Sequence, residues 1–365
     1  MKKRIGILFT AAALLLSMLA GCADSAENSS TESSTPSSTT SESSSSSEES
    51  SQTEEEGAFP VTITDASGRE VTIEEEPETL VSGYYITTSM LIALGEEDKL
   101  VGVEAKANTR PIYSLAAPEL LELPSVGTAK EFDLEGCAAL EPDLVILPLK
   151  LKDSVSALED LGIQAITVNP EDLSLLEETI TMLGKATGAT ETAEKLLAFN
   201  EETQDKLDSL LKDVEKPTVY LGGNSSFLST AGAAMYQNTL IELGGGANVA
   251  AELTDTYWAE VSYEQILEWN PQVIIIVPEA GYTKEDVLAD AQLAEVDAVK
   301  NKQVYEMPSA FEAWDSPVPS AMLGSLWMAA TLHSDVYSTE DFQKDVADFY
   351  QEFYGFTADT AQLAE

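Results

Sequence analysis

The sequence is poor in basic residues, histidine and cysteine, and each shortage excludes a class of function. Only 19 Lys and Arg residues stand against 64 Asp and Glu residues, which gives a formal net charge of −45 at pH 7. A surface this acidic repels nucleic acid and anionic lipid headgroups, so we expect neither as a partner. The single histidine, His333, cannot supply the several ligands that a bare zinc or manganese site needs, and we place it at a helix end. We therefore expect no metal centre and no cofactor.

Long apolar runs are also missing, except at the start of the chain. Lys2, Lys3 and Arg4 precede an apolar stretch and then Cys22. This layout is typical of an export signal, and Leu19-Ala20-Gly21-Cys22 resembles the bacterial lipobox, in which the cysteine is acylated. No later run reaches the roughly 20 apolar residues that a membrane-spanning helix needs. We therefore expect residues 1–22 to be a lipoprotein signal peptide, and the mature protein to be held outside the cell membrane through lipidated Cys22 alone.

Two further stretches follow from composition. Residues 23–56 are almost entirely Ser, Thr and Glu, which cannot bury enough apolar surface to fold, so we predict a disordered linker there. The second cysteine, Cys137, is left without a disulfide partner once Cys22 is lipidated. It lies between apolar neighbours, and we interpret it as a small core residue.

The sequence contains an internal repeat of one segment. DLEGCAALEPDLVILP begins at Asp133, and SYEQILEWNPQVIIIVP begins at Ser262. With Pro142 aligned to Pro271, an offset of 129 residues also aligns Glu135 with Glu264. A glutamate, an apolar stretch, a proline and a β-branched run stay in register in both copies. This repeat predicts two similar halves.

Short apolar strands alternate with helical stretches on both sides of the chain's middle, which predicts α/β lobes with mainly parallel sheets. A β-hairpin is expected at VTITDASGREVTI, from Val61 to Ile73. Between the halves, an apolar stripe at helical spacing predicts one long helix, closed by Pro217. We expect an N-terminal lobe at 57–188, the linking helix at 189–216 and a C-terminal lobe at 217–365. A helix buried in a single domain is the alternative.

The expected strands and helices are as follows. Strands are predicted at 100–103, 144–147, 164–168, 218–221, 273–277 and 303–305, and helices at 87–94, 134–140, 154–161, 173–183, 236–243, 263–269 and 318–332.

With these residues in place, the chain resembles the substrate-binding lipoproteins of ABC importers for iron–siderophore complexes, haem and cobalamin. The hairpin, the segment LPSVGTAKEFDLEGCAALEPDLVIL, the segment VSYEQILEWNPQVIII and the single linking helix carry the resemblance, which covers nearly all of 59–356. It implies two similar Rossmann-like α/β lobes joined by one long helix, with the ligand in the cleft between them. The helical linker also implies a stiff molecule that closes only slightly on its ligand. We expect a monomer without enzymatic activity.

The resemblance gives the repeated glutamates a role. In this family, glutamates at the positions of Glu135 and Glu264 pair with arginines on the two halves of a membrane permease, which works with a cytoplasmic ATPase. A pseudo-symmetric pair of carboxylates can address a two-fold permease, since Arg–carboxylate pairs are directional. The alternative is that both are solvated glutamates that favour a helix N-terminus.

Ligand contacts are expected from loops at strand ends that face the cleft, where open α/β sheets bind ligands. Aromatic side chains are concentrated in these loops and suit a macrocycle or a catecholate, although packing between the lobes is an alternative for each. The expected ligand-binding residues are Tyr84, Tyr85, Lys106, Arg110, Thr128, Lys130, Tyr257, Trp258, Phe311 and Trp314.

Arginine is scarce, and this affects the choice of ligand. Arg110 is the one arginine that can reach the cleft, with Lys106, Lys130 or Lys150 nearby. Anionic chelates are often met by arginine clusters, so a highly charged tris-catecholate fits poorly. We expect a metal chelate, with an iron(III)–siderophore first, a cobamide second, and haem or an oxyanion after these.

Two other classes of function remain as alternatives. An enzyme on this scaffold would need a nucleophile with its base, and the sequence contains no G-x-S-x-G, no Cys–His pair and no metal-ligand spacing. A surface adhesin or sensor would show ligand-independent binding to a macromolecule. The glycine-rich stretches near Gly222 and Gly244 match no nucleotide-binding pattern, and we interpret them as turns and a helix cap.

Overall fold

The computed structural model describes residues 59–254 and 257–363 of the chain. The predicted signal peptide, with Cys22, and the predicted linker at 23–56 lie outside the described residues. The described residues of both lobes belong to one compact unit. Within the described part, no helix is long and apolar enough to cross a membrane.

The described part opens with the predicted hairpin. Strand β1 (Val61–Thr64) pairs antiparallel with β2 (Glu70–Ile73). Asp65 closes the turn, because its carboxylate accepts hydrogen bonds from the backbone N–H groups of Ser67 and Arg69, each at 3.0 Å. The hairpin prediction is confirmed, and the hairpin lies against the N-terminal lobe, since the N–H of Ala66 bonds to the carbonyl of Thr167.

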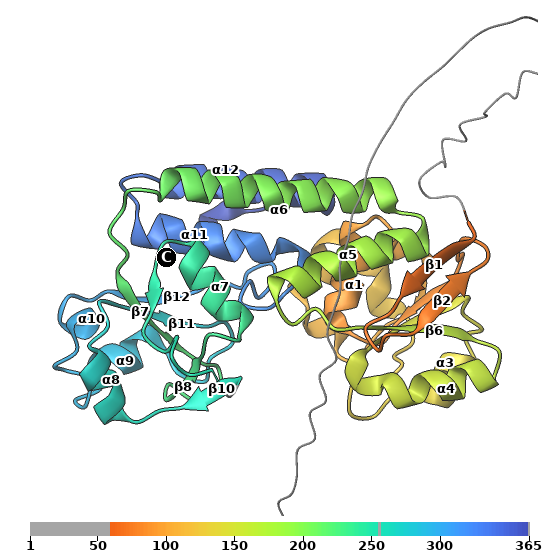
Figure 1. The fold of residues 1–365 in the computed structure, drawn as a ribbon, viewed down its shortest axis with the longest axis horizontal. Coiled ribbons are helices and arrows are strands. Elements are labelled where there is room, and N and C mark those ends of the chain that lie inside the picture. Colours follow the sequence, from red (N-terminus) through yellow and green to blue (C-terminus); the bar gives the residue numbers. More distant parts are fainter. Residues whose placement is uncertain (1–58, 255–256, 364–365) are drawn as a thin grey trace, which may run out of the picture. The chain divides into compact units, whose positions relative to one another are not determined.

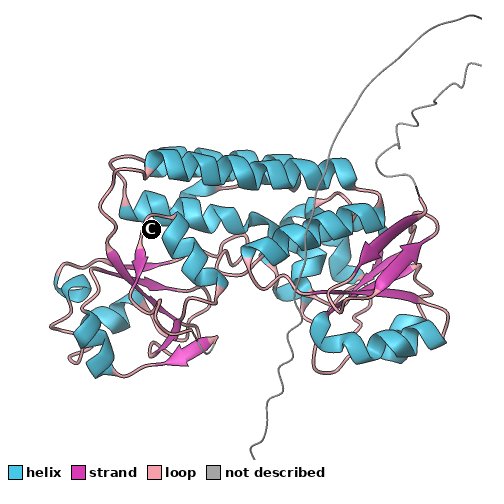
Figure 2. Ribbon diagram, in the orientation of Figure 1, coloured by secondary structure: helices cyan, strands magenta, loops and turns pink. Residues whose placement is uncertain are grey.

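The N-terminal lobe is built on a four-stranded parallel sheet. Its strand order is β4-β3-β5-β6, with β3 at Leu80–Ser82, β4 at Leu100–Gly102, β5 at Leu144–Pro148 and β6 at Gln164–Val168. Helices cover it on both faces (Figures 1 and 2). These are α1 (Tyr85–Ala93), α2 (Pro111–Ala116), α3 (Leu134–Ala138), α4 (Lys152–Asp160) and α5 (Leu173–Thr187), with short 3-10 turns at Glu97–Lys99, Ala107–Thr109, Pro118–Glu122 and Leu149–Leu151.

The C-terminal lobe has the same plan. Its parallel sheet runs β9-β7-β11-β12, with β7 at Thr218–Gly222, β9 at Ala247–Asn248, β11 at Val273–Ile276 and β12 at Val304–Glu306. A separate antiparallel pair joins β8 (Ser229–Ala231) to β10 (Trp258–Glu260). The helices are α7 (Tyr236–Leu243), α8 (Tyr263–Trp269), α9 (Lys284–Ala289), α10 (Asp297–Lys300), α11 (Met322–Leu332) and α12 (Thr339–Phe353), with 3-10 turns at Pro319–Ala321 and Thr360–Leu363.

The two sheets therefore share one topology: the first strand of each lobe lies inside the sheet, its second strand lies at one edge, and the last two strands add on the other side. Each sheet buries both faces, so residues alternate between two cores along a strand. In β5, Leu144 and Ile146 join the large central core, whereas Val145 and Leu147 pack with Cys137. The predicted fold of two similar α/β lobes with parallel sheets is confirmed.

The predicted linking helix is α6 (Thr190–Leu210), which is 21 residues long. It ends at Leu210, before the predicted limit of 216, and a turn follows in which the N–H of Val214 bonds to the carbonyl of Leu211. Its buried stripe packs on α5, α7 and α11, and Phe199 meets Phe349 of α12 with ring centroids 4.8 Å apart (Figure 1). The central core contains residues of both lobes. The helix is therefore a packed layer rather than a free rod.

Candidate functional site

The repeated segment folds into a short helix followed by a strand in both lobes. Helices α3 and α8 begin at equivalent positions, each after a capping side chain: Asp133 accepts from the N–H of Gly136 at 2.9 Å, and Ser262 accepts from the N–H of Gln265 at 3.2 Å. Such N-caps satisfy backbone donors that the helix itself leaves open. The offset of 129 residues thus relates the two capping residues to each other, and also the two residues whose N–H groups they accept.

The end of each unit is also shared. Glu141 and Asn270, which precede the paired prolines, both adopt left-handed backbone conformations, with φ of 50° and 44°. The next pair of polar residues fastens the unit to the first strand of its lobe: Asp143 accepts from the N–H of Thr79 at 2.9 Å, and Gln272 accepts from the N–H of Thr218 at 2.9 Å. The repeat is therefore a structural duplication.

Glu135 and Glu264 occupy matching places in this unit. Each is the second residue of its helix, and each side chain is exposed to solvent. Hydrogen bonds from its own backbone N–H and from Ser262 hold the pKa of Glu264 below its usual value. Negative charge is favourable in a first helical turn, so the arrangement is compatible with both the docking prediction and its alternative.

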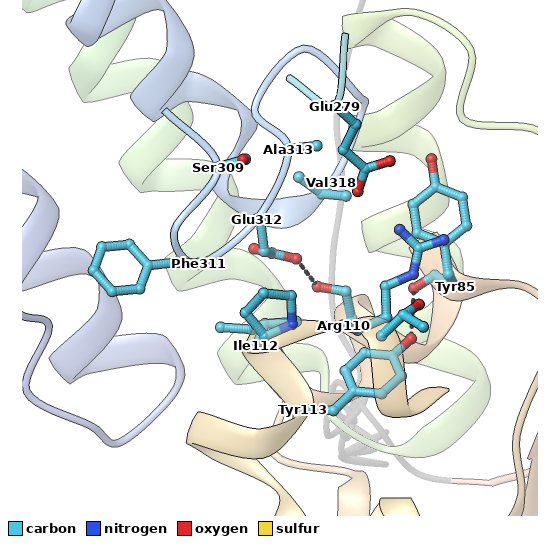
Figure 3. A pocket seen from close by; sticks show the side chains of 13 residues that line it. Tyr85, Arg110, Ile112, Tyr113, Glu279, Ser309, Phe311, Glu312, Ala313 and Val318 are labelled. Atoms are coloured by element: carbon cyan, nitrogen blue, oxygen red, sulfur yellow. Dashed lines mark hydrogen bonds between the residues drawn. The ribbon is translucent and has the colours of Figure 1, made fainter. Parts of the chain in front are cut away.

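A cavity of about 160 Å³ lies between the lobes (Figure 3). Its walls come from the start of α1, the segment around α2, the loop after β11 and the loop between β12 and α11. It is lined by Tyr85, Ser89, Thr109, Arg110, Pro111, Ile112, Tyr113, Glu279, Ser309, Phe311, Glu312, Ala313 and Val318.

Arg110 brings a positive charge to this cavity. It is the N-cap residue of α2, and Pro111 at the first helical position is pre-organised for the helix that follows. The guanidinium lies over the ring of Tyr85, 4.1 Å from its centroid, as Figure 3 shows. It forms no ion pair with any described residue. The cation is thus held in place by an aromatic face, with N–H donors left for a ligand.

The two buried acids near Arg110 accept hydrogen bonds from hydroxyl groups. Glu104 accepts from Thr88 at 2.6 Å and from the hydroxyl of Tyr113 at 2.8 Å. Glu312 accepts from Ser89, from Ser320 and, at 3.1 Å, from the hydroxyl of Tyr354. Burial raises the pKa of both carboxyl groups. Neither acid therefore neutralises the guanidinium through an ion pair.

A second cavity, of about 170 Å³, shares Tyr85 with the first. It lies between the first turns of α1 and α7, one from each lobe. Neither helix has a side-chain N-cap, since Tyr84 and Met235 occupy those positions without a capping hydrogen bond. Its lining residues are Tyr84, Tyr85, Ile86, Pro170, Glu171, Met235, Tyr236, Gln237, Tyr257 and Pro317.

The chemistry of this second cavity suits an acceptor-rich ligand. The first N–H groups of a helix have no partner within it, and the helix dipole adds positive potential there. The hydroxyl of Tyr236 is buried, has no hydrogen-bond partner in the described part and can donate to such a ligand, whereas the unpartnered Oε1 of Gln237 is an acceptor and would need a donor on the ligand or a water molecule. Gly83 permits the tight turn into α1, because a Cβ there would lie 2.6 Å from Cδ2 of Leu147. Two opposed helix N-termini form an environment that favours an anion.

One acid, Glu171, lines this cavity, and a second, Asp315, is hydrogen-bonded through its backbone carbonyl to the lining residue Gln237. Burial raises the pKa of Asp315 to about 7, and the charge of Glu279 adds to the effect. Gln237 donates from Nε2 to the backbone carbonyl of Asp315 at 2.8 Å. At the mouth, the hydroxyl of Tyr257 donates to the carboxylate of Glu171, and this bond crosses from one lobe to the other.

The cavities collect five of the ten predicted ligand residues. Tyr85, Arg110 and Phe311 line the first cavity, and Tyr84, Tyr85 and Tyr257 line the second. Phe311 also packs on Tyr350, with ring centroids 4.9 Å apart.

The other five lie elsewhere. Thr128 closes its own turn, because its Oγ1 accepts from the N–H groups of Lys130 and Glu131. Lys106 and Lys130 are exposed and line neither cavity, and the ring of Trp258 lies over Gly223 in the C-terminal lobe.

Trp314 needs a correction. It is only 1% exposed, and its Nε1–H donates to the hydroxyl of Tyr350 at 3.0 Å. It was expected at the ligand because it stands in an aromatic loop segment beside Phe311. The same segment instead turns its tryptophan into the central core, where the ring meets Phe342 with centroids 5.9 Å apart.

Glu104, Tyr113, Tyr236, Gln237 and Glu312 were not predicted. A signal for the two acids was present, since Glu104 and Glu312 each follow or precede apolar residues within short apolar segments, which indicates burial. No comparable signal marks Tyr236 or Gln237, whose roles depend on the approach of the opposite lobe.

No group of His, Cys, Asp and Glu residues in the described part is arranged to hold a metal ion. His333 caps α11 at its C-terminal end, with Nε2 3.0 Å from the carbonyl oxygen of Gly245. Cys137 is buried, and burial raises the pKa of its thiol to about 11.

Comparison with known proteins agrees with this architecture. Residues 80–311 match the periplasmic binding protein family. The chain is 28% identical over 319 residues to the molybdate-binding protein MolA of Haemophilus influenzae, covering 80% of this chain and 90% of that protein. It is 30% identical to YvrC of Bacillus subtilis, an uncharacterised ABC transporter substrate-binding lipoprotein, covering 84% of this chain and 90% of YvrC. The structure of molybdate-bound MolA superposes with a TM-score of 0.71 at 26% identity, covering 82% and 99% of the two chains.

The resemblance drawn from the sequence is thereby confirmed, and with it the expectation that the protein is not an enzyme. The chain belongs to the periplasmic binding protein family, as an extracytoplasmic substrate-binding protein of an ABC importer.

Proposed function

We propose that this protein captures a compact anionic metal compound outside the cell, with a metal oxyanion as the first candidate, and delivers it to an ABC permease. The observation that carries the proposal is the pair of cavities that meet at Tyr85 between the lobes. One presents the guanidinium of Arg110, and the other lies between the first turns of α1 and α7. Guanidinium and helix N-termini are the two protein groups best suited to oxygen-rich anions.

The size of the site supports a compact ligand. Pockets for drug-sized molecules usually measure roughly 300–1,000 Å³. The two cavities measure about 160 and 170 Å³, so that together they reach only the lower end of this range. A cobamide or a haem would require the lobes to separate well beyond this arrangement. The molybdate-binding relative is consistent with a small oxyanion.

An iron(III)–siderophore, the ligand first expected from the sequence, is the second candidate. Tyr84, Tyr85 and Tyr257 line the second cavity and offer flat aromatic contact. A small chelate that bridges both cavities would use these rings together with Arg110. The scarcity of other cations disfavours a larger, highly charged chelate, because Arg110 is the only Arg or Lys among the lining residues of the two cavities.

The test is a binding panel on the full-length protein. Calorimetry with molybdate, tungstate and sulfate, ferric catecholate and hydroxamate chelates, and cyanocobalamin would rank the candidates. Loss of a charge-assisted hydrogen bond weakens binding by about 10- to 100-fold, so Arg110→Gln should have an effect of this size. Lys152→Gln on α4, which removes an exposed charge outside both cavities, is the matched control. Tight binding of cyanocobalamin, or binding unaffected by Arg110→Gln, would overturn the proposal.

The remaining parts of the proposal concern delivery. Glu135 and Glu264 are proposed to pair with arginines on the two halves of a permease dimer that works with a cytoplasmic ATPase. Lipidation of Cys22 is proposed to hold a monomeric protein at the outer face of the membrane, with 23–56 as the linker. Release of the Cys22→Ser protein from membranes into the medium is the expected result if the anchor is correct.

A further inference from the structure

Glu279 and Arg110 face the same cavity from opposite lobes. Arg110 precedes α2 in the N-terminal lobe, and Glu279 follows β11 in the C-terminal lobe. Figure 3 shows the carboxylate of Glu279 pointing towards the guanidinium and the ring of Tyr85. In the described part of the chain, the two side chains do not form an ion pair with each other or with any other group.

The backbone of Glu279 is held in an unfavourable conformation. Its φ of 59° lies in the left-handed region, which side chains other than Gly, Asn and Asp rarely adopt. Such strain persists only where the surroundings impose it, and it occurs often at ligand sites. The strained turn directly follows Pro278 and places the acid at the wall of the cavity rather than further along the loop.

Glu279 is also the acid with free oxygens. Two acids line the cavity, and the carboxyl group of Glu312 is already bound by Ser89, Ser320 and Tyr354. No hydrogen bond of Glu279 is found among the described residues. Its charge does act on the site, because it contributes to the raised pKa values of Tyr85 and Asp315. A carboxylate and a guanidinium, both unpaired, thus share one small space.

We infer that Glu279 sets the charge selectivity of the cleft, because its negative charge faces the cavity of Arg110 and opposes an anionic ligand without pairing with the guanidinium. The inference depends on the proposed function, because it takes Arg110 as the anion-binding cation. In the ligand-free protein, the carboxylate partly offsets the positive potential of Arg110 at the cavity. A ligand with two negative charges then binds against the repulsion of Glu279, whereas a neutral chelate is not repelled.

The test compares Glu279→Gln with the wild-type full-length protein by calorimetry. The substitution keeps the size of the side chain and removes its charge. For molybdate, the dissociation constant should fall by about tenfold, because an exposed like charge at the wall of the cavity no longer repels the anion. The gain should shrink as ionic strength rises, since the side chain is exposed. A neutral ferric hydroxamate chelate, from the second candidate class, should show no gain. Glu285→Gln on α9, an exposed acid outside both cavities, is the control and should change nothing.

The outcomes separate this inference from the proposed function. If wild type binds an oxyanion through Arg110 but Glu279→Gln binds it equally well or more weakly, the inference is wrong and the proposed function stands. If Glu279→Gln alone binds an oxyanion at accessible concentrations, both are supported. If neither protein binds any member of the oxyanion series, the proposed function fails and takes this inference with it.

Discussion

Ser89 in the N-terminal lobe donates a hydrogen bond to the carboxyl group of Glu312 in the C-terminal lobe. The same carboxyl group accepts hydrogen bonds from the hydroxyl groups of Ser320 and Tyr354. One buried acid therefore joins α1, the turn before α11 and the end of α12. This contact lies at the wall of the first cavity. The junction of the lobes and the candidate ligand site are therefore parts of one structure.

Replacing Glu312 by alanine, which removes the carboxyl group, should destabilise the protein more than replacing it by glutamine, which removes only the charge. Glu312→Ala removes the shared acceptor of three buried hydroxyl groups, of which Ser89 and Tyr354 keep only the hydrogen bond between them, and we expect a loss of about 3 kcal/mol in the free energy of unfolding. Glu312→Gln keeps an acceptor oxygen and should stay within about 1 kcal/mol of wild type. Urea denaturation measures both, with exposed Glu285→Ala as the control. Equal effects of the Ala and Gln variants would contradict the assigned role of the hydrogen bonds.

Asp315 predicts a dependence of stability on pH. Burial raises its pKa from 3.8 to about 7 in the folded protein. Because the folded pKa lies above the unfolded one, the contribution to stability is complete below pH 3.8 and is lost as the pH rises through about 7. Urea denaturation from pH 4 to pH 8 should show wild type losing up to about 4 kcal/mol relative to Asp315→Asn, at about 1.4 kcal/mol for each pH unit. A constant difference between the two proteins would show that Asp315 titrates normally.

The sequence was most informative where structure depends on nearby residues. The internal repeat predicted the positions of α3, α8, β5 and β11, because helix caps, turns and apolar runs are determined by residues close together in the sequence. Helix α7 was predicted at its observed bounds, Tyr236–Leu243. The end of α6 was placed too late, since nothing before Pro217 in its stripe of apolar residues marks the point where the chain turns towards β7.

The site was less predictable, because it is made by the approach of two lobes. Some residues of the predicted aromatic loops line the two cavities and others do not: Tyr85 lines both cavities, whereas Trp314 packs in the core. The difference depends on which side of a short loop faces α12, and periodicity does not encode this. Arg110 was identified by elimination among three arginines. Glu312 was overlooked, because two of the three hydroxyl groups that solvate it, those of Ser89 and Tyr354, come from positions distant in the sequence.

The hydrogen bond between Tyr257 and Glu171 predicts a role in ligand retention. It joins the two lobes at the mouth of the second cavity, and 60% of the Tyr257 side chain remains exposed. An exposed hydrogen bond contributes little to stability, so Tyr257→Phe should change the free energy of unfolding by about 1 kcal/mol or less. The ligand should dissociate a few times faster, because opening of the mouth no longer breaks this bond. Stopped-flow chase experiments would measure the rate, and an unchanged rate would remove Tyr257 from the exit path.

The twin acids predict a separation of binding from transport. Glu135→Ala combined with Glu264→Ala should leave ligand affinity within about twofold of wild type, because both side chains are exposed on α3 and α8 and line neither cavity. Uptake by cells that carry the cognate permease should fall by at least about tenfold, since two directional Arg–carboxylate contacts would be lost at once. Each single variant should show an intermediate loss, as the pseudo-symmetry of the caps at Asp133 and Ser262 implies equivalent contributions. Glu268→Ala, on α8 and also exposed, removes a charge outside the repeated pair and should preserve uptake. If the double variant transports normally while Glu268→Ala does not, the docking surface lies on another face of the helix, and Glu135 and Glu264 act only as favourable charges in the first turns of α3 and α8.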